Sequence, residues 1–426
     1  MPSADDFLQT LRKSDLVAAD RVAWIVSQAP DEVRSDARKL ADRFIEADAL
    51  TPFQAQKLLD GISTGLRLGR YVIRSPIARG GMGTVYLAKD SRKDRLVAIK
   101  VMSPQRAKEG KRHLLRFQRE ITLTRKLDHR NIAQAVDVGL EHGIHFLVLE
   151  YIPGQTLNRL VQQGGPLAVD RAARIFVDVA DGLTHAHSQG VIHRDLKPGN
   201  IMVLPRDKAK VLDLGLALIH GERSEDIELL GGRGYLVGSI DYMAPEQTRD
   251  PTLVDARADL YAMGCSIYYA LTGKAPFAET PAKEKVRAQR QVMPMPITQR
   301  NSAVPEAFAR IVERLMSKQP DDRPASAAEA RALLLPWSEG TPTSEATFLP
   351  INPELGDQNL YRQDTLAEAF AGLQSSTDSL TSLENVRQLF EEANEFRRKA
   401  VQSVAMIGVF LVTALVVYVL IQFMRR

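Results

Sequence analysis

The chain has 426 residues, of which 44% are hydrophobic and 25% are charged, which excludes a wholly disordered chain, a collagen and a protein of many membrane spans. Lys and Arg number 56 and Asp and Glu 52, so the net charge of +4 is too small for a dedicated nucleic-acid binder. The single cysteine, Cys265, excludes internal disulfides and cysteine-based zinc sites. At this length we expect two or three domains.

The first segment, residues 1–69, has the apolar spacing of three or four short helices. Pro30 and the Thr51-Pro52 pair interrupt the pattern, and Gly61 ends it. We expect Thr51 to cap a helix whose first residue is Pro52. The segment contains no catalytic combination of side chains. We therefore interpret it as a structural helical region, with a docking surface for another protein as the alternative.

Residues 71–335 change character along the chain. Short runs of β-branched and aromatic residues come first, at 71–73, 85–87 and 97–99, and longer helical patterns follow after about residue 155. Strands followed by helices predict an α+β fold with two lobes.

The segment that follows, residues 336–362, is rich in Pro, Thr, Glu and Gly without a period, which is typical of a surface linker. Residues 363–399 have a helical pattern again and form the predicted juxtamembrane helical segment. Leu366, Leu373 and Leu380 suggest a seven-residue stripe that polar residues interrupt, so a coiled coil is an alternative there.

Residues 400–423 form an uncharged apolar run with basic residues on both sides. About 20 apolar residues suffice for a helix to cross the hydrocarbon layer of a membrane. We therefore expect a C-terminal transmembrane helix that anchors the chain, with the functional mass N-terminal to it. The alternative is a buried core helix. The flanking basic residues leave the orientation open.

A glycine-rich run occupies residues 77–85, where glycines let backbone amides approach an anion. In dinucleotide-binding proteins a helix follows such a run, but here the β-prone residues 84–88 follow. We therefore expect the tip of a β-hairpin that folds over a ligand. The residues of this loop are Ile77, Ala78, Arg79, Gly80, Gly81, Met82, Gly83, Thr84 and Val85.

Lys100 ends an apolar strand, where a half-buried sheet would not hold an ammonium group without a partner anion. A phosphate would supply that anion. Residues 117–127 have helical spacing and offer Glu120 as the carboxylate that holds the ammonium group in place.

The segments 191–203 and 211–215 place two carboxylates, a carboxamide and a lysine between β-prone runs. Asn200 and Asp213 offer the hard oxygen ligands that Mg²⁺ prefers. Asp195 can accept a proton from an attacking hydroxyl group, and Lys197 can neutralise a phosphoryl group in transfer.

Together these motifs resemble the signature set of a eukaryotic-like protein Ser/Thr kinase of the bacterial type, over residues 71–335. The resemblance implies a bilobal kinase fold that binds ATP and Mg²⁺, with the glycine run, Lys100 and Glu120 at the phosphates and residues 149–151 as the hinge that meets the adenine. The hinge contacts that it implies are Glu150 and Tyr151. Further motifs are VAIK at 97–100, HRDLKPGN at 193–200, DLG at 213–215, APE at 244–246, Asp259 and Arg323.

The resemblance also implies two structural roles. Glu246 would pair with Arg323, and Asp259 would steady the catalytic loop at 193–200. Lys197 and Ser239 resemble the Ser/Thr branch of the family more than the Tyr branch.

Several positions depart from the family pattern. Ala78 replaces the first glycine of the loop, from which we expect an altered KM for ATP and not a dead enzyme. Leu214 replaces the phenylalanine of DFG and leaves the metal ligand intact. Gly231 and Arg233 stand where bacterial relatives carry activation-loop threonines. We therefore expect the anion that meets Arg194 to come from acidic residues of this segment or from a phosphorylated Ser224.

The sequence thus predicts a membrane-tethered protein Ser/Thr kinase whose catalytic domain faces the cytosol, where protein substrates and ATP are, and which binds no nucleic acid. Input would come through the N-terminal helices, through juxtamembrane pairing of two copies into a homodimer, or through confinement to the membrane. The rival interpretation is a membrane-anchored pseudokinase scaffold, which only Ala78 favours. A third makes the N-terminal helices the chief function. His185 and His187 are interpreted as helix packing residues and Cys265 as a buried core thiol.

Overall fold

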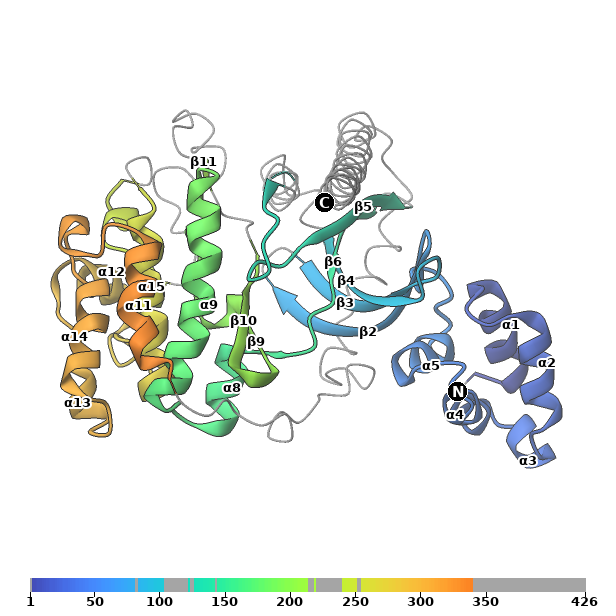
Figure 1. The fold of residues 1–426 in the computed structure, drawn as a ribbon. Helices are drawn as coiled ribbons and strands as arrows, with labels where there is room; N and C mark the ends of the chain where they lie inside the picture. Colours follow the sequence, from blue (N-terminus) through green and yellow to red (C-terminus); the bar gives the residue numbers. More distant parts are fainter. Residues whose placement is uncertain are drawn as a thin grey trace, which may run out of the picture.

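The computed structural model describes residues 2–80, 83–102, 122, 126–141, 144–213, 218–219, 240–250 and 254–339 (Figure 1). The predicted juxtamembrane segment at 363–399 and the predicted transmembrane helix at 400–423 lie outside these ranges, as does most of the predicted linker. Within the described ranges, no helix combines the length and the apolar character needed to span a membrane.

The N-terminal segment folds into five short helices, where the sequence pattern predicted three or four. The extra helix is a single turn that begins after Pro30. Thr51 caps the last helix and Pro52 is its first residue, as predicted. The five helices are α1 (Ala4–Ser14), α2 (Ala19–Ser27), α3 (Asp31–Arg34), α4 (Ala37–Glu46) and α5 (Pro52–Leu59).

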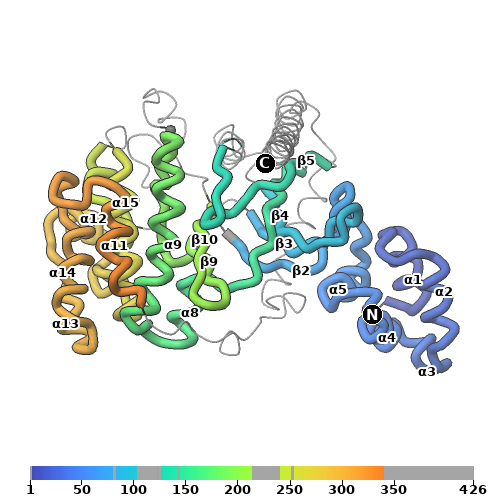
Figure 2. The backbone as a smooth tube through the Cα atoms, viewed as in Figure 1, coloured from blue at the N-terminus to red at the C-terminus, as the bar shows by residue number. Residues whose placement is uncertain are grey.

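A six-stranded antiparallel sheet follows, with the strand order β1-β2-β3-β4-β6-β5. It lies between the N-terminal helices and the helical part of the chain (Figure 2). The strands are β1 (Arg67–Leu68), β2 (Tyr71–Gly80), β3 (Gly83–Asp90), β4 (Arg95–Met102), β5 (Ala135–Glu141) and β6 (Ile144–Glu150).

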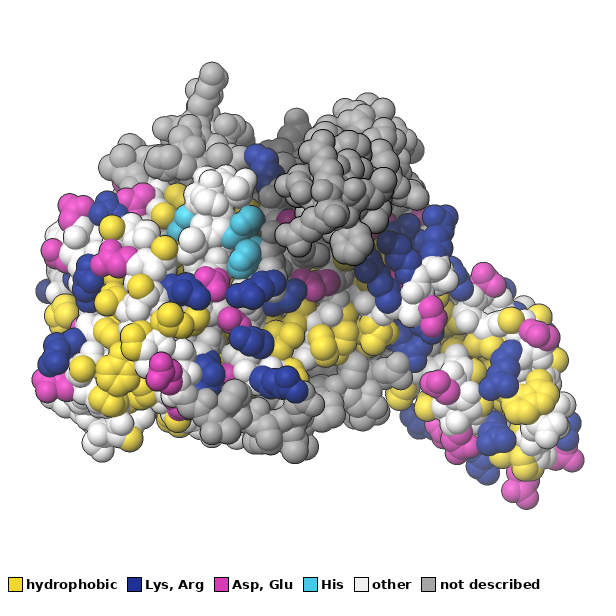
Figure 3. All heavy atoms as spheres, viewed as in Figure 1, with side chains coloured by type: hydrophobic (Ala, Val, Ile, Leu, Met, Phe, Trp, Pro, Cys, Tyr) yellow, Lys and Arg dark blue, Asp and Glu magenta, His cyan; other side chains and the backbone are white. Residues whose placement is uncertain are grey.

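The two faces of this sheet have different neighbours, because side chains alternate along each strand. Tyr86 and Ile99, which face each other across β3 and β4, belong to one buried cluster with Phe53 and Leu58 of α5. The N-terminal helices therefore share a continuous hydrophobic core with the sheet. The surface of these helices mixes apolar, basic and acidic side chains (Figure 3).

The remaining part of the molecule is mainly helical and is built around α11, in which every residue from Ala258 to Leu271 is buried. A helix that is apolar on all sides is typical of a domain centre. The main helices are α8 (Leu157–Gly164), α9 (Val169–Ser188), α11 (Arg257–Thr272), α12 (Ala282–Gln291), α13 (Ile297–Arg300), α14 (Glu306–Leu315) and α15 (Ala327–Leu334).

Short strands connect this helical part to the sheet. In one small sheet β9 lies between β10 and β7, and β8 pairs with β11 in another. These strands are β7 (Gln155–Thr156), β8 (Val191–Ile192), β9 (Ile201–Leu204), β10 (Lys208–Val211) and β11 (Leu218–Ile219).

The predicted α+β fold with a strand-rich part and a helical part is confirmed (Figure 1). Just after residue 335, Trp337 packs edge-on against Phe308 of α14, with 5.2 Å between the ring centroids. Cys265 is fully buried, as predicted, and burial raises the pKa of its thiol to about 12.

Candidate active site

The glycine-rich run lies at the end of the β2–β3 hairpin, as predicted, and a strand follows it instead of a helix. Gly81 and Met82 lie outside the described residues, while Gly80 and Gly83 pair across the hairpin. Gly83 is also required by packing, because a Cβ atom there would come within 1.9 Å of the carbonyl oxygen of Val101. The hairpin therefore depends on glycine for its fit against β4 as well as for access to its backbone.

Lys100 lies on the sheet face opposite the N-terminal helices. Cross-strand pairing places it beside Val85, and the alternation along β4 places Ala98 on the same face. Leu149 pairs with Ala98 and continues this face. The apolar side chains of Val85 and Leu149 are partly exposed, so they offer a surface for a planar ring next to an ammonium group.

The ammonium group of Lys100 reaches across to the helical part of the molecule. Its Nζ atom lies 3.0 Å from Oδ1 of Asp213, and Lys100 is only 8% exposed. The predicted partner Glu120 lies outside the described residues. The pairing of Lys100 with Asp213 brings a predicted phosphate ligand and a predicted metal ligand together.

The loop at 193–200 gathers the other predicted residues. Lys197 Nζ lies 2.7 Å from Oδ2 of Asp195. The amide nitrogen of Asn200 donates to the backbone oxygen of Asp195 at 2.8 Å and to its Oδ2 at 3.3 Å. The loop ends in a single 3-10 turn, η1 (Pro198–Asn200), in which the backbone N–H of Asn200 donates to the carbonyl oxygen of Lys197. These contacts hold the Asp195 carboxylate between a cation and an amide.

A buried aspartate on α11, Asp259, supports the loop at 193–200 through hydrogen bonds. Oδ2 of Asp259 accepts the backbone N–H of His193, and its Oδ1 accepts the N–H of Arg194, both at 2.9 Å. Burial raises the pKa of Asp259, but its bonds to His187 and the His193 backbone outweigh this and lower the pKa, so the carboxylate stays charged. The predicted role of Asp259 is confirmed.

The His193 side chain joins the same loop to the end of β10. Its Nδ1 accepts the backbone N–H of Asp195 at 3.2 Å, so its proton lies on Nε2, which donates to the carbonyl oxygen of Leu212 at 2.9 Å. His193 is 1% exposed. These two hydrogen bonds thus fix the position and the tautomer of the His193 ring, which in turn supports the loop.

The β9–β10 hairpin brings Asn200 and Asp213 to the same place. Ile201 pairs with Val211, and the N–H of Leu212 donates to the backbone oxygen of Asn200 at 2.8 Å. Asp213 follows in a left-handed backbone conformation, with φ of 57°, as does Arg194 with φ of 64°. Such conformations are uncommon for residues other than glycine and often occur at functional sites.

The predicted hinge makes a contact that sequence reasoning missed. The Glu150 side chain lies 2.6 Å from Nζ of Lys210 on β10 and also accepts the backbone N–H of Gln134 at 3.0 Å. Its carboxylate therefore binds protein groups, and its backbone N–H donates to the carbonyl oxygen of Gln134 at 3.0 Å. A nucleotide contact at Glu150 would thus use its backbone carbonyl oxygen. Tyr151 follows it and is partly buried.

Two further residues of the site were not predicted. His187 lies 2.8 Å from Oδ2 of Asp259, whereas the neighbouring His185 stacks on His129 with centroids 5.1 Å apart. Gln247 donates to the carbonyl oxygen of Arg194 at 2.9 Å. In the sequence, a polar side chain on a helix that is otherwise largely apolar could have indicated a buried polar partner for His187. The interpretation of His187 as a packing residue missed this.

The implied ion pair between Glu246 and Arg323 is confirmed. The two carboxylate oxygens of Glu246 accept hydrogen bonds from the two terminal nitrogens of Arg323, at 2.6 and 2.8 Å. The Arg323 side chain is fully buried, and its guanidinium lies over the ring of Tyr261. This pair fixes the chain around residue 246 to the helical core.

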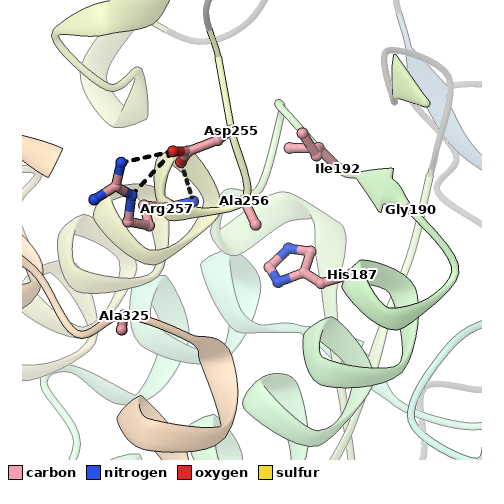
Figure 4. Close-up of a pocket in the computed structure, with 7 residues that line it drawn as sticks. All are labelled: His187, Gly190, Ile192, Asp255, Ala256, Arg257 and Ala325. Carbon is pink, nitrogen blue, oxygen red and sulfur yellow. Dashed lines mark hydrogen bonds and ion pairs between the residues drawn. The ribbon is translucent and has the colours of Figure 1, made fainter. Parts of the chain in front are cut away.

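A cavity of about 280 Å³ lies next to His187, the residue that bonds to Asp259 (Figure 4). His187 lines one side and the Asp255–Arg257 ion pair lines another. In the part of the chain that the structure describes, no residue predicted to bind nucleotide or metal lines this cavity. The described residues that line it are His187, Gly190, Ile192, Asp255, Ala256, Arg257 and Ala325.

The assembled site fits a nucleotide and a magnesium ion. The amide nitrogen of Asn200 points to Asp195, which leaves its carboxamide oxygen for another ligand, and Asp213 adds carboxylate oxygens. Such hard oxygens are the ligands of Mg²⁺. The partly exposed apolar face next to Lys100 suits an adenine ring followed by phosphates.

Comparison with known proteins agrees with this geometry. Serine/threonine-protein kinase pkn3 of Myxococcus xanthus is 39% identical over 272 residues, which cover 62% of this chain and 49% of that protein. Serine/threonine-protein kinase PknB of Mycolicibacterium smegmatis is 36% identical over 276 residues, covering 64% and 43%. PknB of Mycobacterium tuberculosis is 33% identical over 278 residues, covering 64% and 44%.

The similarity covers less than half of the length of each of these relatives. The family model for the protein kinase domain matches residues 71–335, which is more than half of the chain and includes every predicted site residue. The chain therefore belongs to the protein kinase family.

Proposed function

We propose that this protein is an ATP- and Mg²⁺-dependent protein Ser/Thr kinase that transfers the γ-phosphoryl group of ATP to hydroxyl groups of cytosolic proteins. The observation that carries the proposal is the position of Asp195. Its carboxylate lies 2.7 Å from the ammonium group of Lys197, on a loop held by Asp259. The 33–39% identity to proteins named serine/threonine-protein kinases supports the choice of acceptor.

In this proposal each site residue has its own role in phosphoryl transfer. Asp195 orients the acceptor hydroxyl group and accepts its proton, and Lys197 neutralises the charge that develops on the phosphoryl oxygens. Lys100 would position the phosphates, and Asn200 and Asp213 would hold Mg²⁺. The bound ion supplies positive charge to the phosphate oxygens.

Glu120 would hold Lys100 from the helix predicted at 117–127, and the hairpin residues 77–85 would cover the phosphates. The backbone at Glu150 and Tyr151 would meet the adenine ring. These roles follow from the family pattern and from the placement of the described residues around Lys100 and Asp213.

The proposal includes attachment to a cell membrane by the apolar segment at 400–423, with the kinase domain on the cytosolic side where ATP is. It also includes an activation segment that does not use the customary threonines, since Gly231 and Arg233 occupy those positions. A phosphate on Ser224 or acidic residues of the segment would then meet Arg194.

The test is phosphopeptide mass spectrometry on the full-length chain incubated with ATP, Mg²⁺ and a generic basic protein, beside the Asp195→Ala variant. We expect phosphoserine and phosphothreonine on the added protein, absent in the variant. Phosphate found only on tyrosine would contradict the proposed specificity, and modification that persists in the variant would contradict the role of Asp195.

A further inference from the structure

The first turn of α5 contains a reciprocal pair of hydrogen bonds. The backbone N–H of Gln54 donates to the hydroxyl oxygen of Thr51 at 3.2 Å, and the N–H of Thr51 donates to Oε1 of Gln54 at 2.8 Å. This capping box satisfies two N–H groups at the helix start. It uses an oxygen of each side chain as the acceptor.

The same two side chains use their donors elsewhere. The hydroxyl group of Thr51 donates to the carbonyl oxygen of Arg74 at 2.6 Å, and the amide nitrogen of Gln54 donates to the carbonyl oxygen of Ile73, also at 2.6 Å. Thr51 is 2% exposed and Gln54 is 3% exposed. Two hydrogen bonds from buried side chains therefore connect the N-terminal helices to the backbone of β2.

These bonds meet β2 where it bends. Arg74 has no counterpart on β3 in the pairing register, and neither does Ile77, so each is an extra residue in the strand. Bulges of this kind bend a strand and increase its twist. On the other side of β2, β1 pairs with Tyr71 and Val72, and the N–H of Ile73 donates to the carbonyl oxygen of Leu66 at 2.9 Å. The donors of α5 therefore take over just where this ladder ends.

The second strand of the hairpin is held from the same helix. Phe53 lies on α5 between the two capping residues, and its ring centroid is 6.3 Å from that of Tyr86 on β3. Tyr86 is fully buried and pairs with Pro76 of β2. Both strands that lead to the glycine-rich run are therefore fixed to α5.

We propose that Thr51 and Gln54 are positioning residues that set the bend of β2 and thereby the place of residues 77–80 and 83–85 over the nucleotide. The N-terminal helices then control nucleotide affinity through two side-chain donors. This inference rests on the proposed function, because it assigns nucleotide binding to the same hairpin.

The test separates the cap from the connection to β2. In the full-length chain, Gln54→Glu keeps the oxygen that caps Thr51 and removes the donor to Ile73. The control is Gln56→Glu, the same change on the same helix, where the side-chain amide donates to the exposed Asp60 carboxylate at 2.8 Å. We expect Gln54→Glu to weaken binding of Mg-ADP and raise the KM for ATP by about threefold to tenfold, with kcat unchanged.

A second pair of variants covers the case in which Gln54→Glu does not fold. Thr51→Ser keeps the hydroxyl group and is expected to bind Mg-ADP like the original chain. Thr51→Val loses both the cap and the bond to Arg74 and is expected to bind more weakly by at least the same factor. Equal affinities in Gln54→Glu and Gln56→Glu, or in the two Thr51 variants, would overturn the inference. So would a fall in kcat without a change in KM.

Direct binding keeps this test apart from that of the proposed function. A chain that binds Mg-ADP but transfers no phosphate would contradict the kinase proposal. The Mg-ADP affinities of the Gln54 and Thr51 variants would still test the inference in that case. A chain that binds no nucleotide would contradict both.

Discussion

The Nζ atom of Lys100 lies 3.0 Å from Oδ1 of Asp213, although 113 positions separate the two residues in the chain. A second ion pair, between Lys210 and Glu150 at 2.6 Å, joins the same two parts of the molecule. Both connect the end of the small β9–β10 hairpin to the large sheet, at its neighbouring strands β4 and β6. The place where nucleotide phosphates and metal would meet is therefore held by charges of the protein itself.

Replacing Lys100 by Met should lower the rate of phosphate transfer by at least about a hundredfold, because the phosphates lose their positioning charge. The thermal stability should change little, since the Asp213 side chain is 42% exposed and water can solvate it. Lys89→Met on the neighbouring strand, where the ammonium group pairs with the exposed Asp94, is the matched control. Similar rates in the two variants would contradict the assigned role.

His187→Leu should lower kcat by about threefold to tenfold, because Asp259 loses one of the hydrogen bonds that orient it under the 193–200 loop. The KM for ATP should not change. His185→Leu is the control, since that ring stacks on His129 instead of bonding to Asp259. Steady-state kinetics of both variants decide the point, and equal kcat values would show that His187 has no special role.

Arg323→Lys should destabilise the fold by about 2–3 kcal/mol, because a lysine cannot reproduce the two-pronged contact with Glu246. Urea unfolding measures the difference. Arg310→Lys, in an exposed pair with Glu306, should leave the unfolding midpoint almost unchanged. A small effect at Arg323 would mean that the buried pair contributes less than its geometry indicates.

His145 is 4% exposed on β6, and burial lowers the pKa of its imidazole below the ordinary 6.5. The unfolded chain therefore binds this proton at a pH where the folded chain does not, so stability falls as the pH decreases from about 6.5 towards the folded pKa. His145→Leu removes this dependence. Melting curves between pH 7.5 and 5 should show a steeper loss of Tm in the original chain, and parallel curves would refute the explanation.

Local patterns allowed much of the fold to be predicted. The cap at Thr51, the strand after the glycine-rich run and the buried Cys265 each depend on a few neighbouring residues or on simple apolar patterning. The contact of His187 with Asp259 spans 72 positions and depends on how α9 packs against α11. One sequence does not encode such a pairing in its local pattern.

The connection of Gln54 to Ile73 was hidden for a different reason. A capping box satisfies the helix start by itself, so nothing in the sequence indicates that the same side chains also donate to a strand. The assignments of Glu120 and of the segments beyond residue 339 remain predictions, since those residues lie outside the described ranges.

The central claim is that Asp195 acts on a hydroxyl group that receives phosphate from ATP. The most direct measurement compares the initial rate of phosphate transfer and the affinity for Mg-ADP in the full-length chain and in its Asp195→Asn variant. The account predicts unchanged affinity and a rate lower by about a hundredfold to ten thousandfold, because an amide cannot accept the proton. Nucleotide binding without any transfer by the unaltered chain, or equal rates in both, would contradict it.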